Sequence, residues 1–246
     1  AGIERVIDVK TTPGTVTHVE HPTPLSGMAA GSLEKIIGCT LGAVGLADPS
    51  RRTACMFNLI NLTMGGYDER LNRPYVMYLW TVGGFGGSPR GEVPLPATMI
   101  YGPGVRQQPT EILERFYPVI VEKTSLWEGS AGAGKVQGGW GSEGRYRLTH
   151  GAARVGIMAD RKDFPIWGVD GGGPGAPQDL VIDEATADER VIGMYGANVP
   201  LGEGSSFVVY TGGGGGYGDP LERDPELVLE DVLEELLTVE QARERY

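Results

Sequence analysis

A chain of 246 residues, 40% of them hydrophobic, is long enough to bury a core and predicts a globular protein of one large or two small domains. The net charge of −11, without a basic run, argues against nucleic acid and against an anionic membrane, because both are bound through lysine and arginine. There is no apolar run of the roughly 20 residues that span a bilayer, no secretory leader and no disulfide framework, so we expect a cytoplasmic protein.

Glycine is the outlier of the composition. The chain has 40 glycines, well above average usage, and they cluster at 83–91, 129–144, 168–175 and 212–218. Two interpretations remain open. The clusters are either the turns and bulges of a loop-rich β protein, or several glycine loops that converge on a ligand or on a partner subunit.

The first predicted elements are two short strands, 5–10 and 15–19, separated by a turn. Apolar residues at helical spacing then predict a helix over 33–44. Asp48 and Pro49 are expected to end this helix, because proline cannot continue it.

Ser26 and Ser32 are both possible N-caps of this first helix. The helix also carries Gly38, Gly42 and Gly45, four and three residues apart. Glycine weakens a helix, so we interpret this stripe as a smooth face that packs closely against another helix or chain.

The centre of the chain predicts mostly strands. A short helix at 109–116 is the exception, since Pro109 begins it and Pro118 closes it. The strands at 144–149 and 152–160 are expected to form a hairpin across His150 and Gly151. The strands expected in this region are 56–64, 75–82, 119–126, 144–149, 152–160, 180–183, 190–192 and 206–211.

The C-terminus predicts two helices. Asp224 is the expected N-cap and Pro225 the first helical residue of the longer one, and Thr238 with Gln241 predicts a capping box for the last one. The solvent-exposed side of the longer helix is expected to carry Glu226, Glu230, Glu234 and Glu235. Its apolar face is expected to consist of Leu227, Val228, Val232, Leu233, Leu236 and Leu237.

The order of these elements predicts an α+β protein. We expect a glycine-rich, mostly antiparallel β centre, flanked by a helix of the N-terminal region and a C-terminal helix pair. The β-rich part would be a single domain over 1–218, with the C-terminal helices at 224–246.

A stretch at 129–136 resembles a phosphate-binding loop, since Gly129, Gly134 and Lys135 fit its pattern. The next residue is Val136, where a hydroxyl is needed to hold magnesium. The glycine-rich residues 137–141 that follow are poor helix formers, so the N-terminal helix dipole that binds phosphate is missing. We therefore expect no nucleotide site in this chain.

Residues for hydrolytic or metal chemistry are scarce. His18 and His21 lie on either side of a bend that does not align them, and the third histidine, His150, stands alone. No H-E-x-x-H, C-x-x-C or G-x-S-x-G pattern occurs. We interpret Cys39 as a small core residue, and Cys55 has no histidine base nearby in sequence.

Asp160 and Arg161 end a predicted strand, and Asp170 lies beside three glycines. Asp170 either places a carboxylate against bare backbone or only holds its own turn. Three tryptophans border glycine loops, where their default role is to cover core or fill an interface: Trp127, Trp140 and Trp167. These residues alone do not disclose a reaction.

Five motifs in order nevertheless resemble a known family. They are Asn61-Leu-Thr-Met-Gly-Gly66, 109–118, 130–141, the set of Asp160-Arg161, Trp167-Gly168 and 171–175, and 212–220. Together they resemble the C-terminal half of hydantoinase B/oxoprolinase proteins, over nearly the whole chain. Each motif is weak, but five in the right order are specific.

The resemblance implies a subunit of an ATP-dependent enzyme that hydrolyses a cyclic amide through a phosphorylated intermediate. A hydantoinase A-like ATPase partner would bind ATP with Mg. A divalent metal such as Zn or Mn would lie in the N-terminal half of the B-type subunit, carried by another chain or a longer precursor. This chain alone is then expected to bind no metal tightly and to have no turnover.

The residues expected to shape the site and hold subunits in register are Asn61, Thr63, Asp160, Arg161, Asp170, Tyr217 and Asp219. None of them is assigned as acid, base or ligand. Two alternatives stay open. One is a subunit of a ketone carboxylase of the acetone or acetophenone type, and the other is a non-catalytic scaffold whose glycine loops are only interface.

Overall fold

The computed structural model describes residues 2, 5–24, 27, 29–91, 96, 106–164 and 166–246. A short π-helical segment, Ala29–Leu33, leads into α1 (Glu34–Ala47), and α2 is Thr110–Phe116. The chain ends with α3 (Pro225–Leu233) and α4 (Val239–Arg245). The strands are β1 (Asn61–Asp68), β2 (Arg73–Trp80), β3 (Val119–Leu126), β4 (Ser142–Leu148), β5 (Ala153–Met158), β6 (Asp179–Ile182), β7 (Arg190–Val191), β8 (Tyr195–Leu201) and β9 (Ser206–Tyr210).

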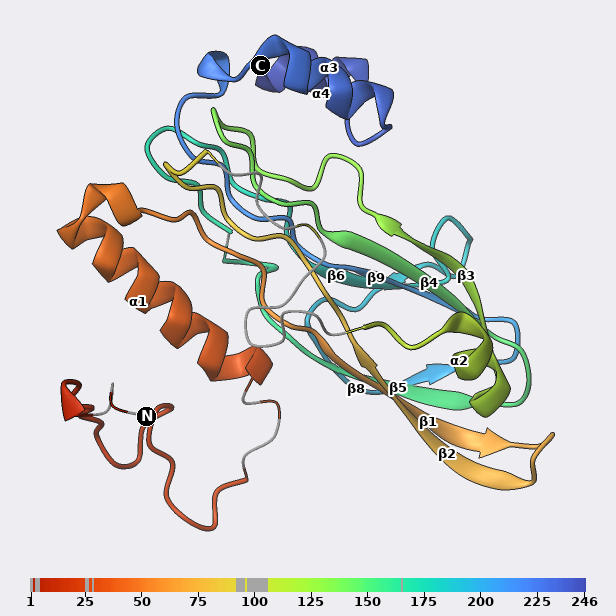
Figure 1. The fold of residues 1–246 in the computed structure, drawn as a ribbon. Coiled ribbons are helices and arrows are strands. Elements are labelled where there is room, and N and C mark those ends of the chain that lie inside the picture. Colours follow the sequence, from red (N-terminus) through yellow and green to blue (C-terminus); the bar gives the residue numbers. More distant parts are fainter. Residues whose placement is uncertain are drawn as a thin grey trace.

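These strands form two antiparallel sheets, which confirms the predicted α+β class. The first sheet has the order β2-β1-β5-β8 and the second the order β3-β4-β9-β6-β7. The two sheets face each other, with α1 to one side and α3 and α4 beyond one end (Figure 1). Within the described residues every helix is too short or too polar to cross a lipid bilayer.

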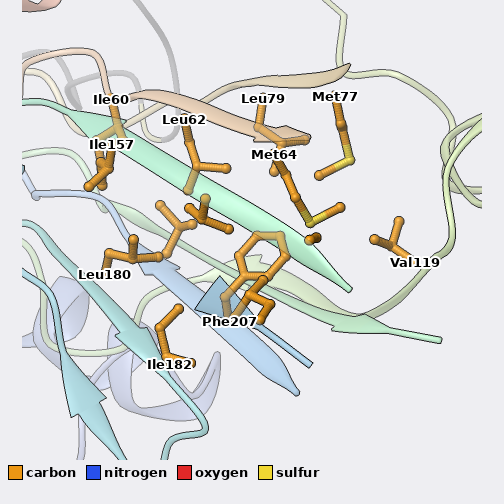
Figure 2. Close-up of a cluster of buried hydrophobic side chains, with 14 of the residues drawn as sticks. Ile60, Leu62, Met64, Met77, Leu79, Val119, Ile157, Leu180, Ile182 and Phe207 are labelled. Atoms are coloured by element: carbon orange, nitrogen blue, oxygen red, sulfur yellow. The ribbon is translucent and has the colours of Figure 1, made fainter. Parts of the chain in front are cut away.

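The main core lies between the two sheets. Figure 2 shows side chains of both sheets meeting there, among them Leu62 and Ile157 of the first sheet and Ile182 and Phe207 of the second. Strand alternation explains this arrangement, because every second side chain points inward. In β2 the buried side chains are Tyr75, Met77 and Leu79, while their neighbours face outward.

The predicted hairpin between β4 and β5 is wrong. β4 pairs with β3 and β9, whereas β5 pairs with β1 and β8, so the chain changes sheet at His150 and Gly151. Both strands bury alternate residues in the same core from opposite sides, Leu148 from one and Val155 from the other. A short connection permits a hairpin but does not require one. A strand in either sheet can bury its alternate apolar side chains in the shared core.

Three other strand predictions differ from the structure. The predicted strands 5–10 and 15–19 are not strands, since this region is almost entirely exposed and has only an isolated bridge between Thr15 and His18. The first sheet strand begins at Asn61 rather than at 56. β8 was not predicted, because Gly196, left-handed Asn198 and Pro200 all read as turn residues.

The glycine runs pack against one another. The run 212–217 lies at their centre, and Gly214 donates to the Gly139 carbonyl at 2.9 Å while its own carbonyl accepts from Gly132 at 2.8 Å. Backbone partners of this run are Cys55, Gly84, Gly87, Gly132, Val136, Gly139, Val169 and Gly173. Figure 1 shows these segments side by side between the sheets and the C-terminal helices. We call this region the glycine bundle.

Close packing requires glycine in this bundle. A Cβ at Gly84 would lie 1.9 Å from the Gly139 carbonyl oxygen, and one at Gly214 would lie 1.8 Å from that of Phe85. The runs therefore converge, as one interpretation expected, but they converge on each other. Contact with a ligand or a partner stays a prediction.

The first helix forms as predicted and Asp48 ends it, but its N-cap was wrong. Leu33 precedes the first residue without a side-chain cap, so Ser32 is not the cap, and Ser26 lies outside the described residues. The glycine stripe packs against loops of the same chain. A Cβ at Gly45 would lie 3.0 Å from the Arg52 Cα, and one at Gly42 would lie 3.8 Å from Trp167.

The C-terminal helices form with the predicted caps at Asp224 and Thr238, and the four glutamates predicted for the solvent-exposed side of the longer helix are exposed. The predicted apolar face is wrong in part, because Leu227 and Leu233 are exposed while Asp231 is buried. Polar contacts of the Asp231 carboxylate explain this difference. Asp231 accepts hydrogen bonds from Arg223 at 3.0 Å and from Gln137 at 3.4 Å, which turns this side of α3 inward.

Candidate functional site

The residues predicted from the sequence fall into three places. Asn61 and Thr63 lie on β1 and face outward from the first sheet. Asp160 and Arg161 follow β5, which pairs with β1 so that Met158 is opposite Asn61. These two places therefore lie at the same end of the β1–β5 pair. The third group, Asp170, Tyr217 and Asp219, lies at the margin of the glycine bundle.

A hollow of about 640 Å³ occupies the outer face of the first sheet. Its floor lacks side chains at Gly65 and Gly156, which lie on the neighbouring strands β1 and β5. Glycine at such positions exposes the backbone to close approach. Its other lining residues are Gly27, Asn61, Thr63, Val76, Tyr78, Arg154, Val155, Ile157, Met158, Gly196, Ala197 and Asn198.

Asn61 carries the polar chemistry at one end of this hollow. Its Oδ1 accepts a hydrogen bond from the hydroxyl of Tyr78, which lies across the β1–β2 pair. Its Nδ2 is buried without a hydrogen-bond partner among the described residues. A buried donor left unpaired costs about 1–3 kcal/mol, so this amide is suited to meeting a carbonyl or carboxylate oxygen. Burial also raises the pKa of Tyr78, so its hydroxyl stays protonated.

A second polar group lies where α1 meets the segment that enters β1. Glu34, in the first turn of α1, is only 1% exposed, and its Oε2 accepts a hydrogen bond from the Leu59 N–H. Its Oε1 has no partner among the described residues. Burial raises the pKa of Glu34 to about 7, against the opposing effects of the Leu59 N–H and the Arg161 charge.

Arg161 connects this carboxyl group to Asn58. Its Nε donates to Oδ1 of Asn58 at 2.9 Å, and Asn58 is fully buried with its Nδ2 unpaired. Arg161 adopts a left-handed backbone, with φ of 68°, which directs its side chain back toward β1. Glu34, Asn58 and Arg161 thus form a buried polar cluster with two unpaired polar atoms.

Asp160 is tied to α1 by an ion pair with Lys35. Burial alone would raise the pKa of Asp160, but hydrogen bonds from Lys35 and from the Arg161 N–H, the latter at 2.7 Å, outweigh it and lower the pKa. Asp160 is therefore ionised at neutral pH. The pair holds the first turn of α1 over the end of β5.

Sequence reasoning missed Glu34, Lys35 and Asn58. A signal for Glu34 exists in the sequence, because it is an acidic residue next to Leu33 in a helix with apolar positions at Ile36 and Ile37. Asn58 has no comparable signal. Its importance depends on Arg161, which is 103 residues away in sequence.

The third group fixes loops and does not line the hollow. Asp170 pairs with Arg52, and its left-handed φ of 52° fits a turn residue. Tyr217 exchanges backbone hydrogen bonds with Val136. Asp219 accepts from the Leu221 N–H at 3.0 Å, as the cap of a short 3-10 helix.

The stretch that resembles a phosphate loop belongs to the glycine bundle. Gly132 donates to Gly214, and the N–H groups of Lys135 and Val136 donate to Gly218 and Tyr217. The Lys135 ammonium pairs with Glu222 at 2.9 Å. These N–H groups and the lysine, which a phosphate would need, are therefore engaged within the chain.

Histidine and cysteine give no further centre. His18 hydrogen-bonds with Thr11 at 2.8 Å in an exposed segment. Cys39 is exposed, so its interpretation as a core residue is wrong, because α1 turns its glycine stripe and Glu34 inward instead. Cys55 is buried, and burial raises the pKa of its thiol. Within the described residues no three His, Cys, Asp or Glu side chains gather to hold a metal ion, so the metal implied by the resemblance has no ligand set there.

Comparisons with known proteins agree with the five motifs. An uncharacterized protein of Methanocaldococcus jannaschii is 30% identical over 247 residues, covering 100% of this chain and 42% of the relative. Caprolactamase subunit beta of Pseudomonas jessenii is 29% identical over 261 residues, covering 100% of this chain and 44% of the subunit. The crystal structure of ATP-dependent caprolactamase from Pseudomonas jessenii matches 99% of this chain and 43% of that chain, with a TM-score of 0.87 and 25% identity.

The chain thus spans less than half the length of these relatives. The family model described as Hydantoinase B/oxoprolinase matches residues 1–220, which include all five motifs. The resemblance inferred from the sequence is confirmed. The chain belongs to the hydantoinase B/oxoprolinase family.

Proposed function

We propose that this chain forms part of the B-type subunit of an ATP-dependent enzyme that hydrolyses a cyclic amide of the hydantoin, oxoproline or lactam type. One observation carries the proposal: the family match, joined to a structural likeness to ATP-dependent caprolactamase over nearly the whole chain. The relatives are more than twice as long, so the complete activity requires polypeptide beyond these residues.

The proposed chemistry follows from the amide bond. The carbonyl carbon of an amide is a weak electrophile. Transfer of a phosphoryl group from ATP to the amide oxygen, with release of ADP, gives an O-phosphorylated imidate that water attacks more readily. We assign ATP and Mg to a hydantoinase A-like partner. The 129–136 loop supports this division, because the N–H groups of Gly132, Lys135 and Val136 already donate to 214–218. The divalent metal is assigned to the part of a B-type subunit that lies outside this chain, since the described residues offer no ligand set.

We propose that the hollow on the first sheet is this chain's share of the substrate site. Its volume falls in the range of roughly 300–1,000 Å³ typical of ligand pockets. Each amide group of such a substrate presents a carbonyl and an N–H, and Asn61 at the edge of the hollow carries an unpaired donor and an acceptor shared with Tyr78. The Thr63 hydroxyl donates to the Gly156 carbonyl at 3.4 Å. Thr63 would limit how deeply the substrate ring enters the hollow.

The test uses the complex purified with its partners. Release of ADP is measured with hydantoin, 5-oxoproline or caprolactam, and separately with a ketone and bicarbonate. Amide-driven ADP release that Asn61→Ala lowers at least tenfold, with assembly unchanged, is the expected result. Release driven only by ketone and bicarbonate would assign the carboxylase function instead. If Asn61→Ala, Asp160→Ala and Asp170→Ala each retained full turnover, the result would favour the alternative of a non-catalytic scaffold.

A further inference from the structure

The outer face of the first sheet carries an unusual strip of large side chains. Val76 is 71% exposed, Tyr78 42% and Trp80 51%, and all three alternate with the buried residues of β2. Tyr78 and Trp80 pack edge to face, with ring centroids 5.8 Å apart. Tyr67 of β1 adds a further ring that is 48% exposed. We call Tyr67, Val76, Tyr78 and Trp80 the β2 strip.

Contiguous apolar groups on a protein surface mark an interaction site more often than isolated ones do. The β2 strip is contiguous and borders the hollow, which both Val76 and Tyr78 also line. Aromatic side chains are enriched at interface centres, where their flat faces exclude water. β2 is also an edge strand of its sheet.

The charge of this face differs from that of the whole chain. The net charge is −11, yet the residues that line the hollow include one arginine and no carboxylate. Arg154 donates from Nη1 to the Asn198 carbonyl at 3.1 Å, and its side chain makes no ion pair with a described carboxylate. A partner that covers this face would therefore match it with apolar side chains and a carboxylate.

We propose that the β2 strip and the rim of the hollow are the docking surface for the remainder of a B-type subunit, the polypeptide that the relatives have beyond the matched 42–44%. The inference rests on the proposed function, because it names the partner of the same site. The remainder lays apolar side chains over Val76 and Trp80 and places a carboxylate against Arg154. Its arrival closes the hollow, so that the substrate site lies between the two parts.

The relative lengths favour this occupant over a second copy of the chain. More than half of a B-type subunit has no counterpart among these residues, and it must contact this part somewhere. A second copy would bring another Arg154 to the same face, since a two-fold interface uses the same patch on both sides. The lining of that second hollow would also offer no carboxylate to Arg154.

Photo-crosslinking in the intact complex tests the proposal. The photoreactive residue p-benzoylphenylalanine replaces Val76 or Trp80, and matched controls replace Ile120 on β3 or Val191 on β7, which are 48% and 57% exposed on the other sheet. The complex is irradiated and the crosslinked peptides are identified by mass spectrometry. We expect the β2 positions to join a hydantoinase B-type sequence outside residues 1–246, and the control positions not to do so.

Crosslinks from Val76 and Trp80 to a hydantoinase A-type sequence, to a second copy of this chain, or to no polypeptide in an assembled complex would each overturn the inference. A second measurement uses Arg154→Glu, which should weaken association with the B-type remainder at least tenfold, while Arg190→Glu on β7 should not. Neither readout needs turnover. Expected crosslinks without amide-driven ADP release would refute the proposed function alone, and the reverse result would refute only this interface.

Discussion

The carboxyl group of Glu34 accepts a hydrogen bond from the backbone N–H of Leu59, so the first turn of α1 is fixed to the segment that enters the first sheet. This contact joins a titratable group to the position of a helix. Its protonation therefore affects the stability of the junction on which Asn58 and Arg161 also depend.

The stability of the protein should fall as the pH rises through the pKa of Glu34. Burial raises this pKa from 4.5 to about 7, so the folded state binds the proton more tightly than the unfolded state. The stabilisation is complete below pH 4.5 and is lost between pH 4.5 and 7, by about 3 kcal/mol. Glu34→Gln should abolish this loss and be more stable than the wild type at pH 8. Urea unfolding at several pH values measures it, with exposed Glu244→Gln as the control.

An equal pH dependence in the wild type and in Glu34→Gln would contradict this assignment. Because glutamine keeps an oxygen for the Leu59 N–H, the variant tests the proton and not the hydrogen bond.

Replacement of Gly214 by alanine should prevent stable folding. The new Cβ would lie 1.8 Å from the Phe85 carbonyl oxygen, so two backbone segments must separate and lose their hydrogen bonds. We expect a loss of at least about 3 kcal/mol, or no soluble protein. Gly202→Ala is the control, since its Cβ meets only the Ser205 hydroxyl at 4.0 Å. Thermal unfolding compares the two, and similar melting temperatures would refute the close packing.

The buried pair of Arg223 and Asp231 should hold α3 against the glycine bundle. The Arg223 and Asp231 side chains are 7% and 12% exposed, and Asp231 also accepts from Gln137. Asp231→Ala leaves the arginine charge buried without its partner, which costs about 3–5 kcal/mol. Glu230→Ala, one residue away and exposed, should cost less than about 0.5 kcal/mol. Denaturant unfolding followed by helical circular dichroism checks both, and equal losses would count against the pair.

Lys135 should have no part in nucleotide binding, although it occupies the lysine position of a phosphate loop. Its ammonium pairs with Glu222, and the N–H groups around it donate within the bundle. Lys135→Ala should leave the KM for ATP of the assembled complex within twofold of the wild type. A tenfold rise in that KM, with kcat preserved, would show that the loop meets phosphate after all.

Local signals predicted the helices and the class of the fold. Asp224 with Pro225 and Thr238 with Gln241 place their helices because caps act within one turn. The pairing of β4 and β5 could not be predicted in this way, since β9, the second partner of β4, and both partners of β5 lie far along the chain.

The candidate site likewise contains residues that local motifs identified and residues that they did not. Asn61, Thr63, Asp160 and Arg161 were identified through their motifs, and the structure brings them to one end of the β1–β5 pair. Glu34 has a local signal that was missed, but its partner Leu59 lies 25 residues away, and Asn58 joins the site only through a contact that crosses 103 residues of sequence. Asp170, Tyr217 and Asp219 share the motifs but hold loops elsewhere.

The central glycine run also constrains how the protein can be made. Residues 212–217 are hydrogen-bonded to segments that begin at Cys55. Because translation runs from the N-terminus, the segments from Cys55 onward are synthesised before the glycine run that fastens them together. Contacts this distant in sequence form slowly, and exposed edges invite aggregation in the meantime. The glycine bundle can therefore form only after residues 212–217 have been synthesised, however early its other segments are made.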